Sequence, residues 1–481
     1  MVCDISRTNL SSKTKIVCTM GPSSSSPEVI TGLLKAGMDV ARINFSHGSH
    51  KDHLRYINTI KRSAKQLNLP VAIMQDLPGP KDRTGKMEMG GVMLQAGADF
   101  TLTTRSVLGN EHYVSVELPD MPRYVKVGDN IFLGDGIIKL EVKAINATDI
   151  QCKVISGGRL NDSQGINMPG TDFGTASLGE DDWAHLDFGI KHEVDFVAVS
   201  FIKEAEDILK VKHFLQEKGS TAMLIAKIER REALDNLDSI LDVTDGIMVA
   251  RGDLGIDIPI QKVPIAQKNI IKKCNRIGKP VIVATQMLES MVDACRPTRA
   301  EVTDVANAIF DGADAVMLSE ETAVGKYPVE AVSMMAEIAI EAEAALPYDE
   351  ILINKGKDVE PKTEDAISYA ACHTAHNLKA AAIVAFTSSG STARRVARYR
   401  PQVPIIAITP YLKTRRQLLL SWGVITYKVK LASNITDMFV QGIRVAKDSG
   451  LAKNGDLIVV TSGVPIGEKG STNLLKVETV F

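Results

Sequence analysis

Short apolar segments alternate with segments of helical periodicity at the start of the chain, with apolar runs at residues 15–20, 38–45 and 71–74. Between the first two runs, Ser26 and Pro27 are suited to an N-cap and a first helical position, and Gly37 is suited to a helix end. Strands connected in this way by helices lie parallel to one another. The pattern therefore predicts a β-α-β-α-β beginning.

The alternation stops between about residues 86 and 179. Short strand-like runs there are separated by turn-forming pairs such as Gly90-Gly91 and Gly157-Gly158, which predicts a small all-β insertion. Strand and helix patterns then resume, with apolar runs at 195–201, 222–228, 246–250, 281–285 and 314–318. Three strands before the insertion and five after it are the eight that a closed (β/α)₈ TIM barrel requires.

A third series of apolar runs occupies the end of the chain, at residues 381–386, 405–409, 424–428, 457–461 and 476–480. This series predicts a separate α/β domain. The fold class expected from the whole pattern is α/β. It comprises a barrel over residues 1–85 and 180–350, an inserted small β-barrel domain over 86–179 and a C-terminal α/β domain over 351–481.

Composition and charge exclude several classes of protein. The formal net charge of the 481 residues is −2, which offers no basic surface for nucleic acid or for a membrane. No apolar run reaches the length of a membrane span, and the N-terminus has no signal-like apolar stretch. The six cysteines form no CxxC pair and suit a reducing compartment. We therefore expect a cytoplasmic protein.

Polar residues stand at the ends of six of the predicted barrel strands. A single charged residue at a strand end is usually solvated surface, but six such ends would converge on one rim of a closed barrel. In chain order these residues are Arg42 and Asn44, Asp76, Lys227 and Glu229, Arg251 with Gly252 and Asp253, Thr285, and Ser319 with Glu320 and Glu321.

The chemistry of these residues indicates a metal-dependent phosphoryl transfer. Glu229 and Asp253 are hard oxygen ligands on adjacent predicted strands, as a Mg²⁺ site uses. Nearby arginines and Lys227 suit a substrate with carboxylate and phosphate groups. Two alternatives share these features: a lyase or aldolase acting on a phosphorylated substrate, and a non-catalytic sensor of phosphorylated metabolites.

Several longer stretches carry a resemblance to the pyruvate kinase family over nearly the whole chain. That family has a barrel, a β lid inserted after the third strand and a C-terminal regulatory domain. The resemblance implies transfer of a phosphoryl group from phosphoenolpyruvate to ADP, giving pyruvate and ATP, with Mg²⁺ as cofactor or Mn²⁺ in its place. The stretches are 42–48 (RINFSHG), 224–229 (LIAKIE), 245–259 (DGIMVARGDLGIDIP), 284–291 (ATQMLESM), 296–308 (RPTRAEVTDVANA) and 311–322 (DGADAVMLSEET).

The resemblance also implies roles for individual residues. Lys227 would neutralise the phosphoryl group in transfer and Arg42 would hold its oxygens. Glu229 and Asp253 would bind Mg²⁺. Gly252, Asp253 and Thr285 would hold the pyruvate carboxylate, and Thr285 would take part in protonating the enolate. The nucleotide would face Asn44, Phe45, Ser46, His47 and Arg83.

One departure from the family pattern concerns a monovalent cation. In K⁺-dependent members the cation is bound at positions that match Asn44, Ser46, Asp76 and Leu77, with a Glu close by, and here that Glu is Lys81. An ammonium group in this position would repel K⁺. We expect that Lys81 replaces K⁺ and that K⁺ is not required. The alternative is that Lys81 points into solvent and K⁺ still binds.

The C-terminal domain contains a run of small hydroxylated residues after its first strand: Thr387, Ser388, Ser389, Gly390, Ser391 and Thr392. Hydroxyl and backbone N–H groups at the start of a helix can bind an anion. The run is therefore interpreted as a phosphate site for an allosteric effector, with an ordinary helix cap as the alternative. Family resemblance further implies a homotetramer.

Overall fold

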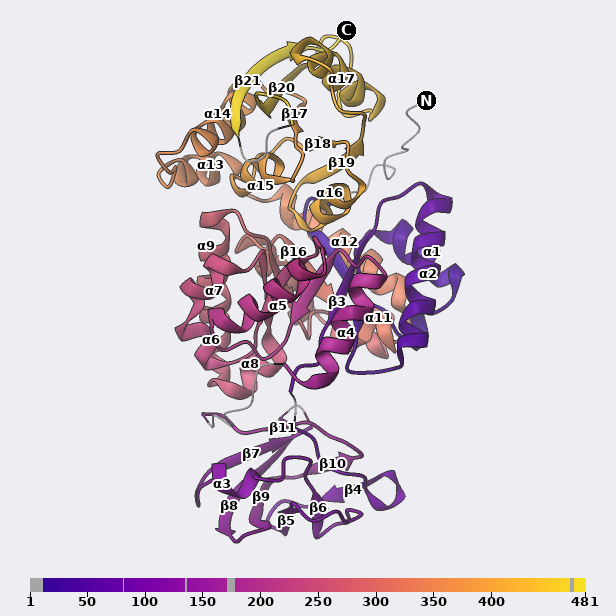
Figure 1. Cartoon of the computed structure of the whole chain (residues 1–481), viewed down its shortest axis with the longest axis vertical. Helices are drawn as coiled ribbons and strands as arrows, with labels where there is room; N and C mark the ends of the chain where they lie inside the picture. The colour runs from indigo at the N-terminus through magenta and orange to yellow at the C-terminus, as the bar shows by residue number, and fades with distance from the viewer. Residues whose placement is uncertain (1–11, 81, 135, 171–177, 468–470) are drawn as a thin grey trace.

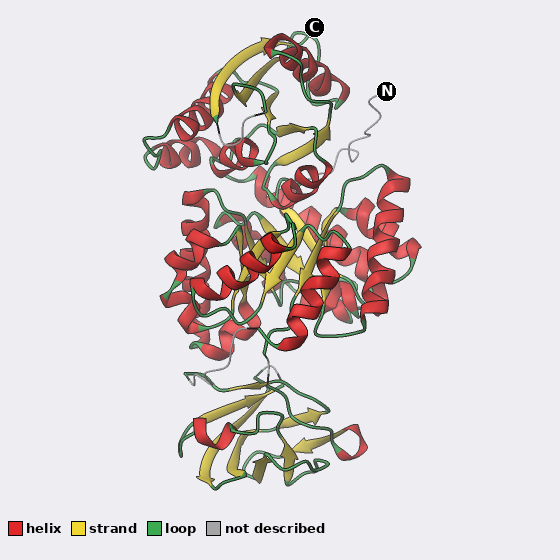
Figure 2. Cartoon of the chain, in the orientation of Figure 1, coloured by secondary structure: helices red, strands yellow, loops and turns green. Residues whose placement is uncertain are grey.

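The computed structural model of the chain describes residues 12–80, 82–134, 136–170, 178–467 and 471–481. Three parts follow one another along its longest axis, with the β insertion at one end, the barrel in the middle and the C-terminal domain at the other end (Figure 1). Helices surround the barrel strands, whereas the insertion consists mostly of strands (Figure 2). The predicted fold class is confirmed, and the residue bounds of the three domains stay predictions.

Eight parallel strands close the barrel in the order β1-β16-β15-β14-β13-β12-β3-β2. The ring closes because β1 pairs in parallel with both β2 and β16. These are the three strands predicted before the insertion and the five predicted after it. Their bounds are β1 (Lys15–Thr19), β2 (Met38–Asn44), β3 (Ala72–Asp76), β12 (Phe196–Val199), β13 (Met223–Ile228), β14 (Gly246–Ala250), β15 (Val281–Ala284) and β16 (Ala315–Leu318).

Local sequence sets where the barrel helices begin. The Ser26 hydroxyl accepts the Val29 amide at 3.2 Å, and Gly37 ends that helix at φ 132°. Ser49 and Asp52 cap the next helix reciprocally. The helices around the barrel are α1 (Pro27–Ala36), α2 (His50–Leu67), α4 (Glu180–Lys191), α5 (Ala205–Glu217), α6 (Arg231–Asp235), α7 (Leu237–Val243), α8 (Arg251–Asp257), α9 (Val263–Ile277), α10 (Arg299–Phe310), α11 (Glu320–Ala323) and α12 (Pro328–Ala344).

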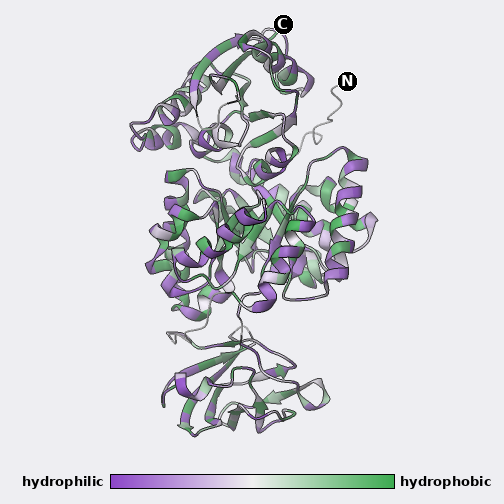
Figure 3. Ribbon diagram, in the orientation of Figure 1, coloured by the Kyte–Doolittle hydropathy of each residue, from purple (hydrophilic) through white to green (hydrophobic). Residues whose placement is uncertain are grey.

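Barrel strands consist mostly of apolar residues, as their green colour in Figure 3 shows. Ile16 and Cys18 pack outward in the cluster that includes the helices, whereas Val17, between them, belongs to a second cluster formed by barrel strands. Leu419 and Leu420 of the C-terminal domain join this second cluster. The C-terminal domain therefore covers one end of the barrel and leaves the carboxyl ends of the strands for a site.

The β insertion has a core of its own, which includes Phe100, Leu102 and Leu140. A six-stranded sheet has the order β11-β7-β8-β9-β5-β6, beside a β10-β4 pair. Its elements are β4 (Gly91–Leu94), β5 (Asp99–Thr103), β6 (Tyr113–Ser115), α3 (Met121–Tyr124), β7 (Asn130–Leu133), β8 (Ile138–Ile145), β9 (Asp149–Ser156), β10 (Gly158–Asn161) and β11 (Ile166–Asn167).

A five-stranded sheet of order β19-β18-β17-β20-β21 forms the C-terminal domain, parallel except for β21. Ion pairs join it to the barrel: Arg400 with Asp314 at 2.9 Å, both buried, and the half-buried Arg416 with the buried Asp195 at 2.8 Å. Within the described ranges, no helix has the length and apolarity that a membrane crossing needs. The elements are α13 (Tyr348–Gly356), α14 (Thr363–Asn377), β17 (Ala382–Phe386), α15 (Ser391–Arg398), β18 (Ile405–Thr409), α16 (Leu412–Gln417), β19 (Val424–Lys428), α17 (Ile435–Asp448), β20 (Leu457–Gly463) and β21 (Thr472–Thr479).

Candidate active site

Four charged side chains from the ends of β2, β3 and β13 form one buried cluster. Asp76, at the end of β3, lies between two cations: its Oδ2 accepts Arg42 Nε at 2.6 Å, and its Oδ1 lies 3.2 Å from Lys227 Nζ. Lys227 Nζ also lies 2.8 Å from Glu229 Oε1. All four residues are at most 9% exposed. The structure thus brings together three residues predicted to serve catalysis and metal binding, with Asp76 joining them.

The electrostatics of this cluster keep its cations charged. Burial alone would lower the pKa of Lys227, but Asp76 and Glu229 raise it above the ordinary lysine value. Burial opposes ionisation of Asp76, yet Arg42 and Lys227 lower its pKa below the ordinary range. Burial raises the pKa of Glu229 in spite of Lys227, and the charge of nearby Asp253 raises it further. Lys227 therefore stays positively charged beside the Glu229 carboxyl, and a further cation bound at Glu229 would keep that carboxyl ionised.

Two strand ends that the sequence analysis passed over also contribute. Ser200, directly after β12, donates to the Leu77 carbonyl at 2.7 Å and accepts from Lys227 Nζ at 2.7 Å. Thr19, at the end of β1, accepts from Arg42 Nη1 at 2.9 Å. Both positions follow from the rule that located the other residues, because every strand of a closed barrel ends on the same rim. Applying the rule to all eight strands would have found them.

Thr285 lies just beyond β15 in a backbone conformation that is costly for a β-branched residue, with φ 70°. Its hydroxyl accepts the Gly252 amide at 2.9 Å and donates to the Ala284 carbonyl at 2.6 Å. Arg251 donates to the Thr285 carbonyl at 2.7 Å and pairs with Asp304 at 2.7 Å. The Gly252 amide, expected to face a substrate carboxylate, is therefore taken by Thr285 in this structure.

The residues present fit the expected divalent ion. Glu229 Oε2 accepts the Phe201 amide at 2.7 Å, so its carboxylate is held in one orientation. Asp253 lies in the first turn of α8, half-buried and close enough to influence the Glu229 charge. Across the described ranges, no three His, Cys, Asp or Glu side chains gather to hold a metal by themselves. Two carboxylates leave the remaining positions to substrate oxygens and water, as Mg²⁺ sites often do.

The side chains of the loop after β2, which is expected to face the nucleotide, differ in their exposure to solvent. His47 is exposed and Ser46 half-buried, whereas the Phe45 ring is only 4% exposed and packs on His53 with centroids 4.0 Å apart. The Phe45 ring is therefore part of the packing beneath the loop, and the expectation that this loop faces the nucleotide stays a prediction. Arg83 lies at the β insertion, where its Nη1 donates to the Ser163 carbonyl at 3.0 Å.

The positions matched to a monovalent-cation site lie near this loop. Asn44 Oδ1 accepts the Ser46 amide at 3.1 Å, and the Leu77 carbonyl accepts the Ser200 hydroxyl. Asp76 is engaged by Arg42 and Lys227. Lys81 lies outside the described residues. The expected replacement of K⁺ by Lys81 stays a prediction.

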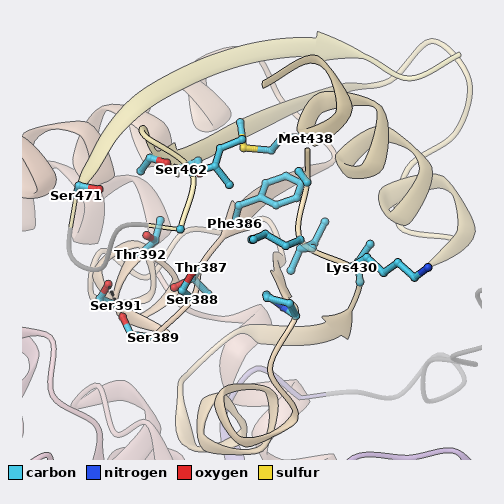
Figure 4. Close-up of a pocket in the computed structure, with 18 residues that line it drawn as sticks. Phe386, Thr387, Ser388, Ser389, Ser391, Thr392, Lys430, Met438, Ser462 and Ser471 are labelled. Atoms are coloured by element: carbon cyan, nitrogen blue, oxygen red, sulfur yellow. Dashed lines mark hydrogen bonds between the residues drawn. The ribbon is translucent and has the colours of Figure 1, made fainter. Parts of the chain in front are cut away.

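The hydroxylated run of the C-terminal domain lines a pocket together with Ser462 and Gly463 at the end of β20. Figure 4 shows the hydroxyls of Ser388, Ser389 and Ser391 gathered on one side, while the Lys430 ammonium points away from them. Gly390 has φ 86° and donates its amide to Thr387 Oγ1 at 2.9 Å. Thr392 Oγ1 lies 2.8 Å from Thr472 Oγ1. The loop 468–470 lies outside the described residues.

Two family models match this chain, the pyruvate kinase barrel domain over residues 11–332 and the pyruvate kinase alpha/beta domain over residues 365–478. The chain belongs to the pyruvate kinase family. It is therefore an enzyme of the phosphotransferase type, which decides against the lyase and sensor alternatives.

Similar proteins cover nearly the whole chain. A pyruvate kinase of Geobacillus stearothermophilus is 48% identical over 471 residues, which are 97% of this chain and 80% of the relative. One from Staphylococcus epidermidis is 46% identical over the same shares. The crystal structure of a pyruvate kinase from Cryptosporidium parvum superposes with a TM-score of 0.91 at 38% identity and covers 98% of this chain and 96% of that one.

Proposed function

We propose that the enzyme transfers the phosphoryl group of phosphoenolpyruvate to ADP, at the carboxyl ends of the barrel strands. The observation that supports this most directly is the buried cluster of Arg42, Asp76, Lys227 and Glu229, in a chain of this family. Such a cluster offers fixed cations to a highly anionic substrate. Phosphoryl transfer depends mainly on positioning and on neutralising charge, which this cluster supplies.

Each residue has a task that its contacts favour. Asp76 and Thr19 orient the Arg42 guanidinium toward the phosphate, and Asp76, Glu229 and Ser200 hold the Lys227 ammonium where negative charge develops. The bond between phosphorus and the enolate oxygen breaks while a bond to the terminal phosphate of ADP forms. The enolate then takes a proton at carbon to give pyruvate, and the Thr285 hydroxyl takes part in delivering this proton.

Mg²⁺, bound by Glu229 and Asp253, would add positive charge to the substrate oxygens during transfer. The raised pKa of Glu229 is consistent with this role, because the carboxyl is buried beside another carboxylate and gains from a nearby cation. The nucleotide would lie against Ser46 and His47, with Arg83 at the β insertion. Closing that insertion would exclude water from the transferred group. The C-terminal pocket would bind a phosphorylated effector through its hydroxyls, and the enzyme would act in the cytoplasm as a homotetramer.

The deciding assay is formation of ATP from phosphoenolpyruvate and ADP with purified enzyme. We expect activity with Mg²⁺, with Mn²⁺ replacing it, and none after removal of divalent ions with EDTA. Phosphorus NMR follows both reactants in the same tube, so loss of phosphoenolpyruvate without matching ATP would refute the proposed reaction. A rate unaffected by EDTA would refute the metal site alone.

A further inference from the structure

Helices α2 and α4 meet through a cluster of four histidines that has no part in the proposed catalytic cluster. His50 Nε2 and His185 Nδ1 are 2.7 Å apart, a hydrogen bond between residues that lie 135 positions apart in the chain. The Phe188 ring stacks on His50, with centroids 4.5 Å apart, and contacts His192 at 4.4 Å. This hydrogen bond is a specific polar connection between α2 and α4, which also meet through these rings.

On one side the histidine pair supports the loop that precedes α2. The buried ring of Phe45 in that loop lies between the cluster members, with centroid distances of 4.0 Å to His53 and 5.1 Å to His185. His53 Nε2 lies 2.9 Å from the His47 carbonyl and must donate to it, because a carbonyl only accepts. The backbone of residues 45–47 is therefore positioned by the cluster beneath it.

On the other side the pair is attached to the base of the β insertion. Asp182, in the first turn of α4, is 2% exposed, and its two oxygens accept the amides of Gly79 at 3.3 Å and Gly179 at 2.8 Å. These glycines lie just before and just after the insertion. Gln75 Nε2 donates to the His185 carbonyl at 2.6 Å and so seats α4 on β3. A Cβ at Gly189 would lie 2.0 Å from Gln75 Oε1, so a larger residue there would displace the Gln75 side chain from its place against α4.

We infer that His185 is a positioning residue for the nucleotide: through its hydrogen bond to His50 it holds the 45–47 loop in register with the base of the β insertion. This inference rests on the proposed function, since it assigns the loop to ADP. His185 itself touches no substrate in this arrangement. Its loss should therefore weaken ADP binding more than phosphoenolpyruvate binding, because Arg42 and Lys227 are held by other partners.

The bond also has a defined dependence on protonation. One nitrogen of the pair must donate and the other must accept, so a doubly protonated pair cannot form it. Burial lowers the pKa of His185, and the charges of His50 and His53 lower it further, against Asp181. The bond is therefore intact near neutral pH and is lost only when both rings are protonated, which the lowered pKa of His185 places below the ordinary histidine value. The charged or titratable groups that surround the cluster are Asp52, His53 and Lys61 of α2, Asp181 and Lys191 of α4, and His192 directly after α4.

Three variants test the inference in the full-length enzyme. His185→Leu keeps the bulk and removes the hydrogen bond, His185→Gln keeps a hydrogen-bonding group that does not titrate, and His213→Gln changes an exposed histidine on α5 as control. At pH 7.5 we expect His185→Leu to raise KM for ADP by about three- to tenfold, the range that one hydrogen bond provides, with KM for phosphoenolpyruvate within about twofold. His185→Gln should stay close to wild type at this pH.

The pH profile separates positioning from a general loss of folding. In wild type and in His213→Gln, KM for ADP should rise below pH 6.5, and in His185→Gln that rise should be smaller. ADP itself titrates near pH 6, so only the difference between variants counts. Equal increases of both KM values in His185→Leu, or an unchanged acid rise in His185→Gln, would overturn the inference. Absence of ATP formation by wild type at pH 7.5 would instead refute the proposed function.

Discussion

Replacing Lys227 by methionine is the sharpest perturbation of the buried cluster. The two side chains have similar length, but methionine lacks the ammonium that contacts Ser200 Oγ at 2.7 Å, Glu229 Oε1 at 2.8 Å and Asp76 Oδ1 at 3.2 Å. After the change Asp76 still pairs with Arg42. Glu229 loses the Lys227 ammonium and keeps its hydrogen bond from the Phe201 amide. Glu229 is therefore the group that is left with an uncompensated charge.

The size of the effect follows from that difference. Removing one partner of a buried ion pair typically costs about 3–5 kcal/mol. The pKa of Glu229 is already raised by burial, so Glu229 can take up a proton at neutral pH and limit the loss. We therefore expect a decrease of about 3 kcal/mol in the free energy of unfolding of the barrel. Loss of the cation that faces the transferred group should lower kcat by more than ~10².

Two measurements and two further variants make this prediction refutable. Initial rates of ATP formation give kcat, and urea unfolding followed by circular dichroism gives stability. Adding Glu229→Gln to Lys227→Met should recover part of the stability and none of the activity. Lys273→Met, which breaks an exposed pair with Asp238, should change stability by less than about 1 kcal/mol. A kcat within tenfold of wild type, or a double variant no more stable than Lys227→Met, would contradict the reasoning.

Three other predictions concern separate parts of the chain. Omitting K⁺ from a Na⁺-free assay should leave the rate unchanged if Lys81 replaces the ion, and strong activation on adding K⁺ would count against this. Thr392→Asp places a carboxylate in the hydroxyl-lined pocket and should abolish any shift of the phosphoenolpyruvate saturation curve by phosphorylated metabolites. Titration of sugar phosphates, nucleoside monophosphates and phosphoglycerate on both proteins checks this. Absence of any shift in wild type would refute the assignment of an effector to the pocket. Burial and the charges of Glu321, Glu320 and Glu301 raise the pKa of Glu289 to about 7. Because this carboxyl binds its proton more tightly in the folded state, its ionisation destabilises the fold as pH rises through 7, and Glu289→Gln should raise Tm at pH 8 but not at pH 4.5; an equal change at both values would exclude this cause.

Local pattern was sufficient for the main elements of the fold. All eight barrel strands were predictable, because a strand in a parallel barrel is apolar on both faces and reads as a continuous run. The order in which polar residues follow those runs was also enough to nominate Arg42, Lys227 and Glu229, since parallel strands end on one rim. The same rule also identifies Thr19 and Ser200 as residues of this rim.

Contacts between segments that lie far apart in the chain could not be predicted from the sequence. The inward turn of Phe45, the positive φ of Thr285 and the acceptance of the Gly252 amide by its hydroxyl depend on which neighbours fill the space around each residue. The bond between His50 and His185 exists only because α2 and α4 pack side by side on the barrel. Hydrophobic periodicity determined the elements and their order, because it is a local property of the chain. Only the tertiary structure decided which polar atoms meet, because that depends on angles and distances between elements.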